Sequence, residues 1–315
     1  MSWAHVSLAM DLRQLEIIRA IADTGSFTAA GHKLHVSQSA ISRQILLLEA
    51  ELGEPVFHRI GRRIRITPAG EALLQLSHRV FQDLQETVSA ISDTQESLRG
   101  TLRLVGGMTV CLYVFPSLLA EVRRTHPNLD LKITVGSGER SLALLRSGVA
   151  DLGLVTLPVD APDLDSVAVL EEELLLITYP AHPLAAKPRI RAADLTGQPF
   201  ILFEAGSITR KLVEEFLARE HIDAQIVMET ENVEIIKAMV RHGLGISIIP
   251  WQAAAADVRT KQLHCSRIAG HALVRDTGWL YPRMRRLPRA VSEVMRVFDQ
   301  IQPQFEAAVR APRNY

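Results

Sequence analysis

Polar side chains able to hydrogen-bond with nucleic-acid bases and phosphates lie close together in one short stretch of this sequence. They are Gln38, Ser39, Ser42 and Arg43. A helix lying in a major groove contacts base edges and phosphates through such short hydroxyl, amide and guanidinium groups. The alternative is the polar face of an ordinary surface helix. The secondary structure around these residues distinguishes the two possibilities.

Two helices joined by a tight turn are predicted to position the four polar residues. The first helix begins at Ser26 and extends to Leu34; after the turn His35-Val36-Ser37, the second extends from Gln38 to about Glu51. Ser37 is a favourable N-cap, and Val36 and Ile41 have the spacing of a hydrophobic staple. The residues expected inside repeat at helical spacing and are Ile41, Ile45, Leu48 and Leu52. The polar residues therefore face outward, near the start of the second helix, which indicates DNA binding.

A short basic hairpin is predicted after the second helix. Arg63-Ile64-Arg65-Ile66 alternates as a strand does, and Gly61 supplies the turn. A basic two-stranded wing beside a recognition helix can contact phosphates or a minor groove through Arg59, Arg62 and Arg63. The alternative is a solvated hairpin. The formal net charge of the chain is zero, but residues 43–65 hold five basic and three acidic residues, so the positive charge is local.

Residues 15–70 together resemble the winged helix-turn-helix of the LysR-type transcriptional regulators. The matching residues are Phe27, Ala29-Ala30, Leu34, Ser37-Gln38-Ser39-Ala40-Ile41-Ser42, Leu48-Glu49, Leu52-Gly53, Phe57, Arg59, Arg62 and Thr67-Pro68-Ala69-Gly70. The similarity continues to about residue 300. Gly31 departs from the pattern, because a glycine inside a helix costs roughly 1 kcal/mol relative to alanine. The resemblance implies a regulator that binds double-stranded DNA.

A long helix is predicted over residues 68–98, with Thr67 as N-cap, Pro68 in the first turn and Gly100 as the glycine that ends it. An apolar stripe follows this helix: Leu73, Leu76, Val80, Leu84, Val88 and Ile91. A helix projecting from a small domain cannot bury such a stripe alone, so we expect it to pack against the same helix of a second chain. The alternative is packing on the C-terminal domain of the same chain. The resemblance further implies tetramers.

Strands alternate with helices from residue 101 onward, which predicts an α/β domain with mostly parallel pairing. The strands are predicted at 102–105, 129–135, 151–155, 174–179, 200–203, 224–228 and 245–249, and the helices at 114–124, 140–146, 208–219 and 234–241. A weak internal repeat, a helix closed by glycine and followed by a buried strand, indicates two similar lobes with a cleft between them.

The resemblance implies that this domain is built like a periplasmic solute-binding protein. It also implies a first lobe of about 101–170 and 273–315 and a second of about 171–272, with the strand at Trp279-Leu280-Tyr281 and a helix over 289–302 returning to the first lobe. The expected fold is thus an N-terminal all-α winged helix-turn-helix (1–67), a linker helix (68–98) and a two-lobed α/β effector-binding domain (99–315).

Small polar residues at the strand ends are candidates for contact with an effector. They are Thr109, Ser137, Thr156, Ser207, Thr209 and Arg210. Helix N-termini offer free amides and partial positive charge, so hydroxyl groups and an arginine there favour a carboxylate or phosphate. The alternative is that Thr109 and Ser207 cap their helices and that Arg210 pairs with Glu214. A small anionic metabolite is the predicted effector.

Length, cysteine content and apolar segments indicate the number of domains and the compartment of the protein. The 315 residues predict two or three domains. The two cysteines, Cys111 and Cys265, exclude a disulfide framework or a metal site; Cys111 is expected to pack in the interior rather than sense redox state. No signal peptide or apolar segment of about 20 residues is found, so a cytoplasmic protein without membrane contact is expected.

The main alternative to a DNA-binding regulator is an enzyme. The sequence has no phosphate-binding Gly-Lys-Ser/Thr loop, no His-Glu-x-x-His, no Gly-x-Ser-x-Gly and no dinucleotide fingerprint, and its histidines lack ligand spacing. A non-enzymatic regulator without cofactor or metal is therefore predicted. A second rival is a binding module that uses its winged domain for protein contacts, and a gel-shift assay separates the three classes.

Overall fold

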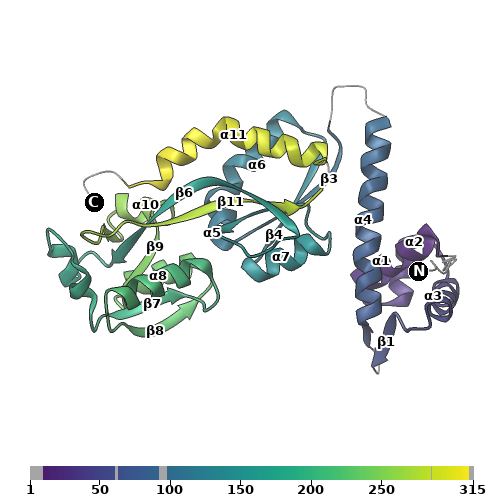
Figure 1. Ribbon diagram of the computed structural model, residues 1–315, viewed down its shortest axis with the longest axis horizontal. Coiled ribbons are helices and arrows are strands. Elements are labelled where there is room, and N and C mark those ends of the chain that lie inside the picture. The colour runs from purple at the N-terminus through teal and green to yellow at the C-terminus, as the bar shows by residue number, and fades with distance from the viewer. Residues whose placement is uncertain (1–9, 61–62, 92–97, 285, 312–315) are drawn as a thin grey trace, which may run out of the picture. The chain divides into compact units, whose positions relative to one another are not determined.

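The computed structural model describes residues 10–60, 63–91, 98–284 and 286–311 (Figure 1). The chain divides near residue 95 into an N-terminal and a C-terminal unit.

The N-terminal unit is a helical domain with a two-stranded wing. Its elements are α1 (Leu12–Thr24), α2 (Phe27–Leu34), α3 (Gln38–Leu52), β1 (Phe57–Ile60), β2 (Arg63–Ile66) and α4 (Pro68–Ile91). Side chains of α1, α3 and the segment before the wing form its core, including Ile18, Ile41, Leu48 and Val56, all fully buried. The predicted helix–turn–helix is confirmed, with Ser26 and Ser37 accepting hydrogen bonds from the Ala29 and Ala40 amides at 3.3 and 3.2 Å.

Glycine is required at position 31 for a structural reason that the sequence pattern did not reveal. Its carbonyl oxygen accepts from Val36 N at 3.0 Å, so the turn folds back tightly over the end of α2. A Cβ atom at Gly31 would lie 2.7 Å from the Val36 carbonyl oxygen. The expectation that glycine weakens α2 relative to alanine is therefore wrong at this position, because alanine does not fit beneath the turn.

Helix α4 begins as predicted and ends differently. The Thr67 hydroxyl accepts from Gly70 N at 3.0 Å and donates to the Pro55 carbonyl at 2.6 Å, which ties the start of α4 to the segment before the wing. The helix is observed to Ile91, and residues 92–97 lie outside the described part of the chain. Gly100 does not cap a helix: it is the first residue of a strand, where it pairs with Leu129.

The apolar stripe of α4 has two environments. Leu73 and Val80 pack on the core of the N-terminal unit, and the Ser77 hydroxyl donates to the Leu15 carbonyl at 3.0 Å. Farther along, Leu84 and Val88 are 40% and 59% exposed. The first half of the stripe is thus partly buried within its own unit, an environment that was not among the two predicted from the sequence. The side chain of Ile91 is outside the description.

The C-terminal unit is built on a mixed sheet of seven strands with a smaller parallel sheet beside it. The large sheet contains β3 (Gly100–Gly106), β4 (Leu129–Val135), β5 (Leu152–Leu157), β6 (Leu164–Thr178), β9 (Ser247–Pro250), β10 (His264–Ser266) and β11 (Leu273–Pro282). Its order is β10-β6-β11-β5-β3-β4, with β9 also on β6, and β7 (Pro199–Phe203) pairs with β8 (Gln225–Thr230).

Pairing is parallel only within each half of this unit. β3 pairs in parallel with β4 and β5, and β7 with β8, as predicted. The long strands β6 and β11 are antiparallel to each other and to their other neighbours. The expectation of mostly parallel pairing is therefore wrong in part: β6 and β11 carry the chain between the two halves in opposite directions (Figure 1).

Helices complete two lobes on these strands. Lobe 1, as we define it, comprises β3–β5 with α5 (Met108–Tyr113), α6 (Phe115–Thr125), α7 (Gly138–Arg146) and α11 (Arg289–Val309); lobe 2 comprises β7–β9 with α8 (Ile208–Arg219), α9 (Val233–Arg241) and α10 (Trp251–Arg259). Two 3-10 turns lie at Pro183–Ala186 and Ala192–Leu195. Phe115, Trp279 and Phe298, nearly inaccessible to solvent, lie in the core of lobe 1. Side chains on β11 and α11 therefore pack with elements from the start of the unit.

Candidate functional site

The outer face of α3 carries the polar residues predicted from the sequence. Gln38, Ser39 and Arg43 are exposed and Ser42 is half-buried. The Gln38 amide donates to the Ser42 hydroxyl at 2.8 Å. Opposite them, Ile41, Ile45 and Leu48 are at most 2% exposed. The buried side fixes the rotation of α3, so this polar face points into solvent at the start of the helix.

The wing is joined to α3 through Glu49. Its carboxylate accepts from Val56 N at 2.7 Å and Phe57 N at 3.2 Å, just before β1 pairs with β2. Arg59 lies on β1 and Arg63 on β2, but their side chains are outside the description. Arg62 and the predicted turn residue Gly61 lie outside the described residues. Arg65, on β2, is exposed.

A cavity of about 110 Å³ lies between the two lobes of the C-terminal unit. It is lined where strands β3, β4, β5, β7 and β8 end, the position at which α/β folds bind ligands. Five of the six predicted effector residues line it: Thr109, Ser137, Thr156, Ser207 and Thr209. Ser207 also caps α8 by accepting from Arg210 N at 3.1 Å, whereas the Thr109 side chain makes no capping hydrogen bond.

Arg210, the sixth predicted residue, does not line the cavity. Its guanidinium group donates to Glu214 at 2.7 Å, to the Phe203 carbonyl at 2.9 Å and to Glu229 at 3.1 Å. These three bonds occupy a side chain that is only 4% exposed. Arg210 therefore pairs with Glu214 one helical turn away, as the alternative had it. The prediction that Arg210 contacts the effector in this cavity is wrong.

Arg275 on β11 is the arginine at the cavity wall, and the sequence analysis missed it. It is 5% exposed; Nε donates to Glu172 at 2.8 Å and Nη1 to the Thr209 hydroxyl at 2.6 Å. Nη2 is buried and has no hydrogen-bond partner among the described residues. Polar groups removed from water normally have partners, so Nη2 is an unsatisfied donor on a residue that lines the cavity. No pattern in the strand 273–282 singles out Arg275, because Asp276 and Thr277 beside it are polar too.

Glu172 holds Arg275 in place from the neighbouring crossing strand. It is 1% exposed and also accepts from the Thr277 hydroxyl at 2.6 Å and from the Gln252 side-chain amide. Glu172 lies on β6 and Arg275 on β11, the two strands that connect the lobes. The cavity is therefore lined by β11 directly, through Arg275, and Glu172 of β6 contacts that arginine.

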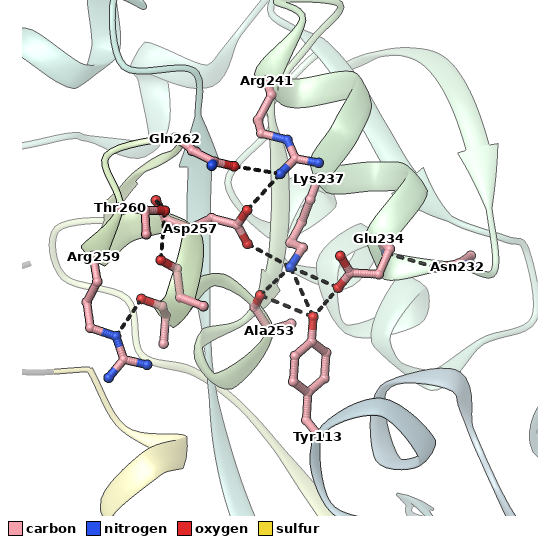
Figure 2. Close-up of polar contacts among 12 residues, drawn as sticks. Tyr113, Asn232, Glu234, Lys237, Arg241, Ala253, Asp257, Arg259, Thr260 and Gln262 are labelled. Atoms are coloured by element: carbon pink, nitrogen blue, oxygen red, sulfur yellow. Dashed lines mark hydrogen bonds and ion pairs between the residues drawn. The ribbon is translucent and has the colours of Figure 1, made fainter. Parts of the chain in front are cut away.

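A second polar cluster joins the lobes through Tyr113, the last residue of α5 (Figure 2). The Tyr113 hydroxyl donates to the Glu234 carboxylate and accepts from Lys237 Nζ at 3.0 Å. Lys237 is 4% exposed and also bonds to Glu234 at 2.8 Å, Asp257 at 2.7 Å and the Ala253 carbonyl at 2.9 Å. Except for Tyr113, every member belongs to lobe 2.

Two members of this cluster, Tyr113 and Lys237, have raised pKa values. Burial, together with the hydrogen bond to Glu234, raises the pKa of Tyr113 to about 12. Burial alone lowers the pKa of Lys237, but hydrogen bonds to Asp257, Glu234 and Tyr113 outweigh it and raise the pKa above its ordinary value. Tyr113 therefore stays a neutral donor and Lys237 a cation. Because Thr109 and Tyr113 are one turn apart on α5, a single short helix connects the cavity with this cluster.

Cys111 does not have the surroundings of a redox-active thiol. Burial raises its pKa to about 11, so the thiolate that oxidants attack is scarce. Its sulfur lies 3.4 Å from the Gly106 carbonyl oxygen. The packing role predicted for Cys111 fits these surroundings.

The described residues offer neither a membrane-spanning helix nor a metal-binding cluster. No helix there has the length and apolar character needed to cross a membrane. Within the same residues, no group of three or more His, Cys, Asp or Glu side chains could hold a metal ion.

Comparison with known proteins identifies relatives along almost the entire chain. Residues 12–71 match the bacterial regulatory helix-turn-helix protein, lysR family, and residues 95–302 match the LysR substrate binding domain. A protein of Trichormus variabilis named "Probable RuBisCO transcriptional regulator" is 33% identical over 304 residues, 95% of this chain and 89% of that protein. The "HTH-type transcriptional activator CmpR" of Synechocystis is 33% identical over 276 residues, 88% and 90% of the two chains.

Solved structures agree in fold. A variant of full-length OxyR from Pseudomonas aeruginosa superposes with a TM-score of 0.77 at 25% identity, covering 91% of this chain and 94% of that one. Full-length CbnR in complex with its target DNA gives 0.66 at 24% identity, covering 92% and 99%. A DNA-binding helical domain, a linker helix and an α/β substrate-binding domain are thus combined as in those proteins. The chain belongs to the LysR family of DNA-binding transcriptional regulators, a family of regulators and not of enzymes.

Proposed function

We propose that the protein recognises a specific DNA sequence through α3 and the wing, and that a small metabolite with an anionic group, bound between the two lobes, modulates its activity. The observation that carries the DNA-binding part is the exposed polar face of α3 above a fully buried underside. Gln38 and Arg43 would read base edges, with Ser39 and Ser42 beside them, while Arg59, Arg62 and Arg63 would contact phosphates or the minor groove.

Replacing Arg43 with alanine is expected to weaken binding to the operator by roughly 1–3 kcal/mol and to relax discrimination at one base pair. Arg62→Ala is expected to weaken all sequences alike and to reduce the salt dependence by about one phosphate contact. The measurement is fluorescence anisotropy with the DNA flanking the protein's own gene, at several salt concentrations and with single base-pair changes.

Arg79→Ala is the matched control for both variants, because Arg79 is an exposed arginine on α4, outside the proposed interface. Folded Arg43 and Arg62 variants that bind all these DNAs as the wild type does would exclude the assignment. The winged domain would then serve protein contacts instead.

The effector part of the proposal is supported by the cavity and by the side chains at its wall. Arg275 offers one unpaired donor, and Thr109, Thr156 and Thr209 also line the cavity. Bound ligand would change the arrangement of the lobes only to the extent that it binds one arrangement more tightly. The contacts of α5 at both ends, with the cavity and with Lys237, offer a physical route for such coupling.

Self-association through α4 is part of the proposal. Leu84 and Val88 are large, apolar and exposed on one side of this helix, where packing against the same helix of a second chain would remove them from water. Ile133 on β4 and Ile226 on β8 are 47% and 44% exposed on edge strands, which suits a second contact and hence a tetramer.

Leu84→Asp is expected to lower the assembly state, because an unpaired carboxylate in an apolar seam is costly to bury. Light scattering after size-exclusion chromatography measures the mass. Leu12→Asp is the control, since it places the same charge at a 49% exposed leucine of α1, away from the stripe. An unchanged mass for Leu84→Asp would exclude the proposed seam.

A further inference from the structure

We propose that the interlobe cavity recognises a small zwitterion, a molecule with a carboxylate at one end and an ammonium group at the other. This inference rests on the proposed function, in which the cavity binds the effector, and it names the chemical class of that effector. Among the described residues, three charged side chains line the cavity, and they carry both signs: Arg275, Glu204 and Glu231.

Arg275 provides the place for the carboxylate. Its Nε and Nη1 are bonded to Glu172 and Thr209, so its orientation is fixed before any ligand arrives. Nη2 is left without a partner among the described residues, although the side chain is almost completely buried. One carboxylate oxygen accepting from Nη2 would satisfy this nitrogen through a charge-assisted hydrogen bond.

Glu204 and Glu231 provide the place for the ammonium group. β7 and β8 are parallel, Phe203 pairs with Thr230, and each glutamate is the next residue in its strand's direction. The two glutamates therefore lie side by side at one edge of the sheet and at one wall of the cavity. Neither carboxylate has a hydrogen bond or ion pair within the described residues. An ammonium group at this wall could donate charge-assisted hydrogen bonds to these carboxylates.

The same charges argue against other ligand classes. Arg275 is already paired with Glu172 and has one nitrogen left to donate, so it can hold only one carboxylate of a ligand. A second negative group would lie near two carboxylates. A metal ion is not favoured either, because the described residues contain no group of three or more acidic, histidine or cysteine side chains that could hold one.

The size of the cavity also bears on the choice of probes. An apolar cavity of about 150 Å³ holds benzene, so the 110 Å³ between the lobes can hold a molecule of about that size. Glycine and β-alanine meet the requirements of charge and size and are suitable minimal probes.

The test is calorimetric titration of the full-length protein with glycine, β-alanine, acetate, methylamine and malonate up to about 50 mM at constant ionic strength. Glycine or β-alanine is expected to bind at least about tenfold more tightly than acetate or methylamine, since each single-charge probe lacks one charge-assisted interaction. Malonate is expected to bind least. Malonate or acetate binding as tightly as both zwitterions would overturn the proposal, as would no binding by any probe.

Variants of the cavity residues test which side chains bind the carboxylate of the ligand and which bind its ammonium group. Glu204→Gln and Glu231→Gln are expected to remove most of the preference for the zwitterions over acetate, without weakening acetate. Arg275→Met is expected to weaken glycine and acetate alike, and Arg275→Lys, which keeps a charge beside Glu172, guards against a folding defect. Glu215→Gln is the matched control, on α8 with a 60% exposed side chain. A preference that persists in both glutamate variants would exclude the ammonium site.

Different results would contradict the proposed function and the proposed zwitterionic ligand. If acetate or malonate binds at the cavity and Arg275→Met abolishes that binding, an anion-responsive cavity stands and only the zwitterion is wrong. If none of the probes binds, the DNA titrations with the Arg43 variant still test the DNA-binding part independently.

Discussion

Lys237→Met is expected to destabilise the C-terminal unit by about 3 kcal/mol, the lower end of the cost of breaking a buried ion pair. Lys237 is 4% exposed, and its ammonium group lies within 3.0 Å of Glu234, Asp257, Tyr113 and the Ala253 carbonyl. Methionine fills a similar volume but leaves these acceptors without their donor. The effect stays at the lower end because Arg241 still bonds to Asp257 at 2.9 Å.

Urea denaturation followed by tryptophan fluorescence measures this change, because Trp251 and Trp279 are buried in the C-terminal unit. Lys211→Met is the matched control: Lys211 is 76% exposed and 3.9 Å from Glu215. Its effect is expected to be below about 0.5 kcal/mol, as for surface substitutions in general. Equal midpoints for the two variants would contradict a stabilising role for the cluster around Lys237.

Gly70→Ala is expected to destabilise the N-terminal unit by roughly 1–3 kcal/mol, the cost of overpacking a filled interior. Helix propensity alone predicts the opposite sign, since alanine is favoured over glycine inside a helix by about 1 kcal/mol. A Cβ atom at Gly70 would overlap the Val56 carbonyl oxygen and lie 2.7 Å from Ile66 Cγ1. These two residues lie before and within the wing, so a shift there also disturbs the proposed DNA contacts.

Hydrogen exchange of the amides in α1–α4 isolates this effect from the C-terminal unit. Gly138→Ala, at the first residue of α7, is the control, because nothing lies within 4 Å of a Cβ atom there. Gly31→Ala is expected to share the sign of Gly70→Ala because of the Val36 carbonyl oxygen 2.7 Å away. Slower exchange in the Gly70 variant would mean that helix propensity outweighs the steric conflict.

Short-range signals along the sequence determined the DNA-binding segment. Ser37 as N-cap, the tight turn after Leu34 and the spacing of Ile41, Ile45 and Leu48 all act within one or two helical turns, so α2 and α3 follow from local sequence. The outward face of Gln38 and Arg43 follows from them. The meaning of Gly31 and Gly70 does not, because the carbonyl oxygens that exclude a Cβ atom are brought there by folding of the backbone.

The tertiary structure decided which charged residues belong to the cavity. Position after a strand end suggested Thr109 and Thr209, which line the cavity, but also Arg210, which bonds to Glu214 and Glu229 instead. Arg275 reaches the cavity because β11 pairs with β6, about a hundred residues earlier in the chain. Glu204 and Glu231 become neighbours only through the register of β7 and β8. Sequence patterns report on neighbours within a helix or strand, whereas a ligand site is assembled by pairings between distant segments.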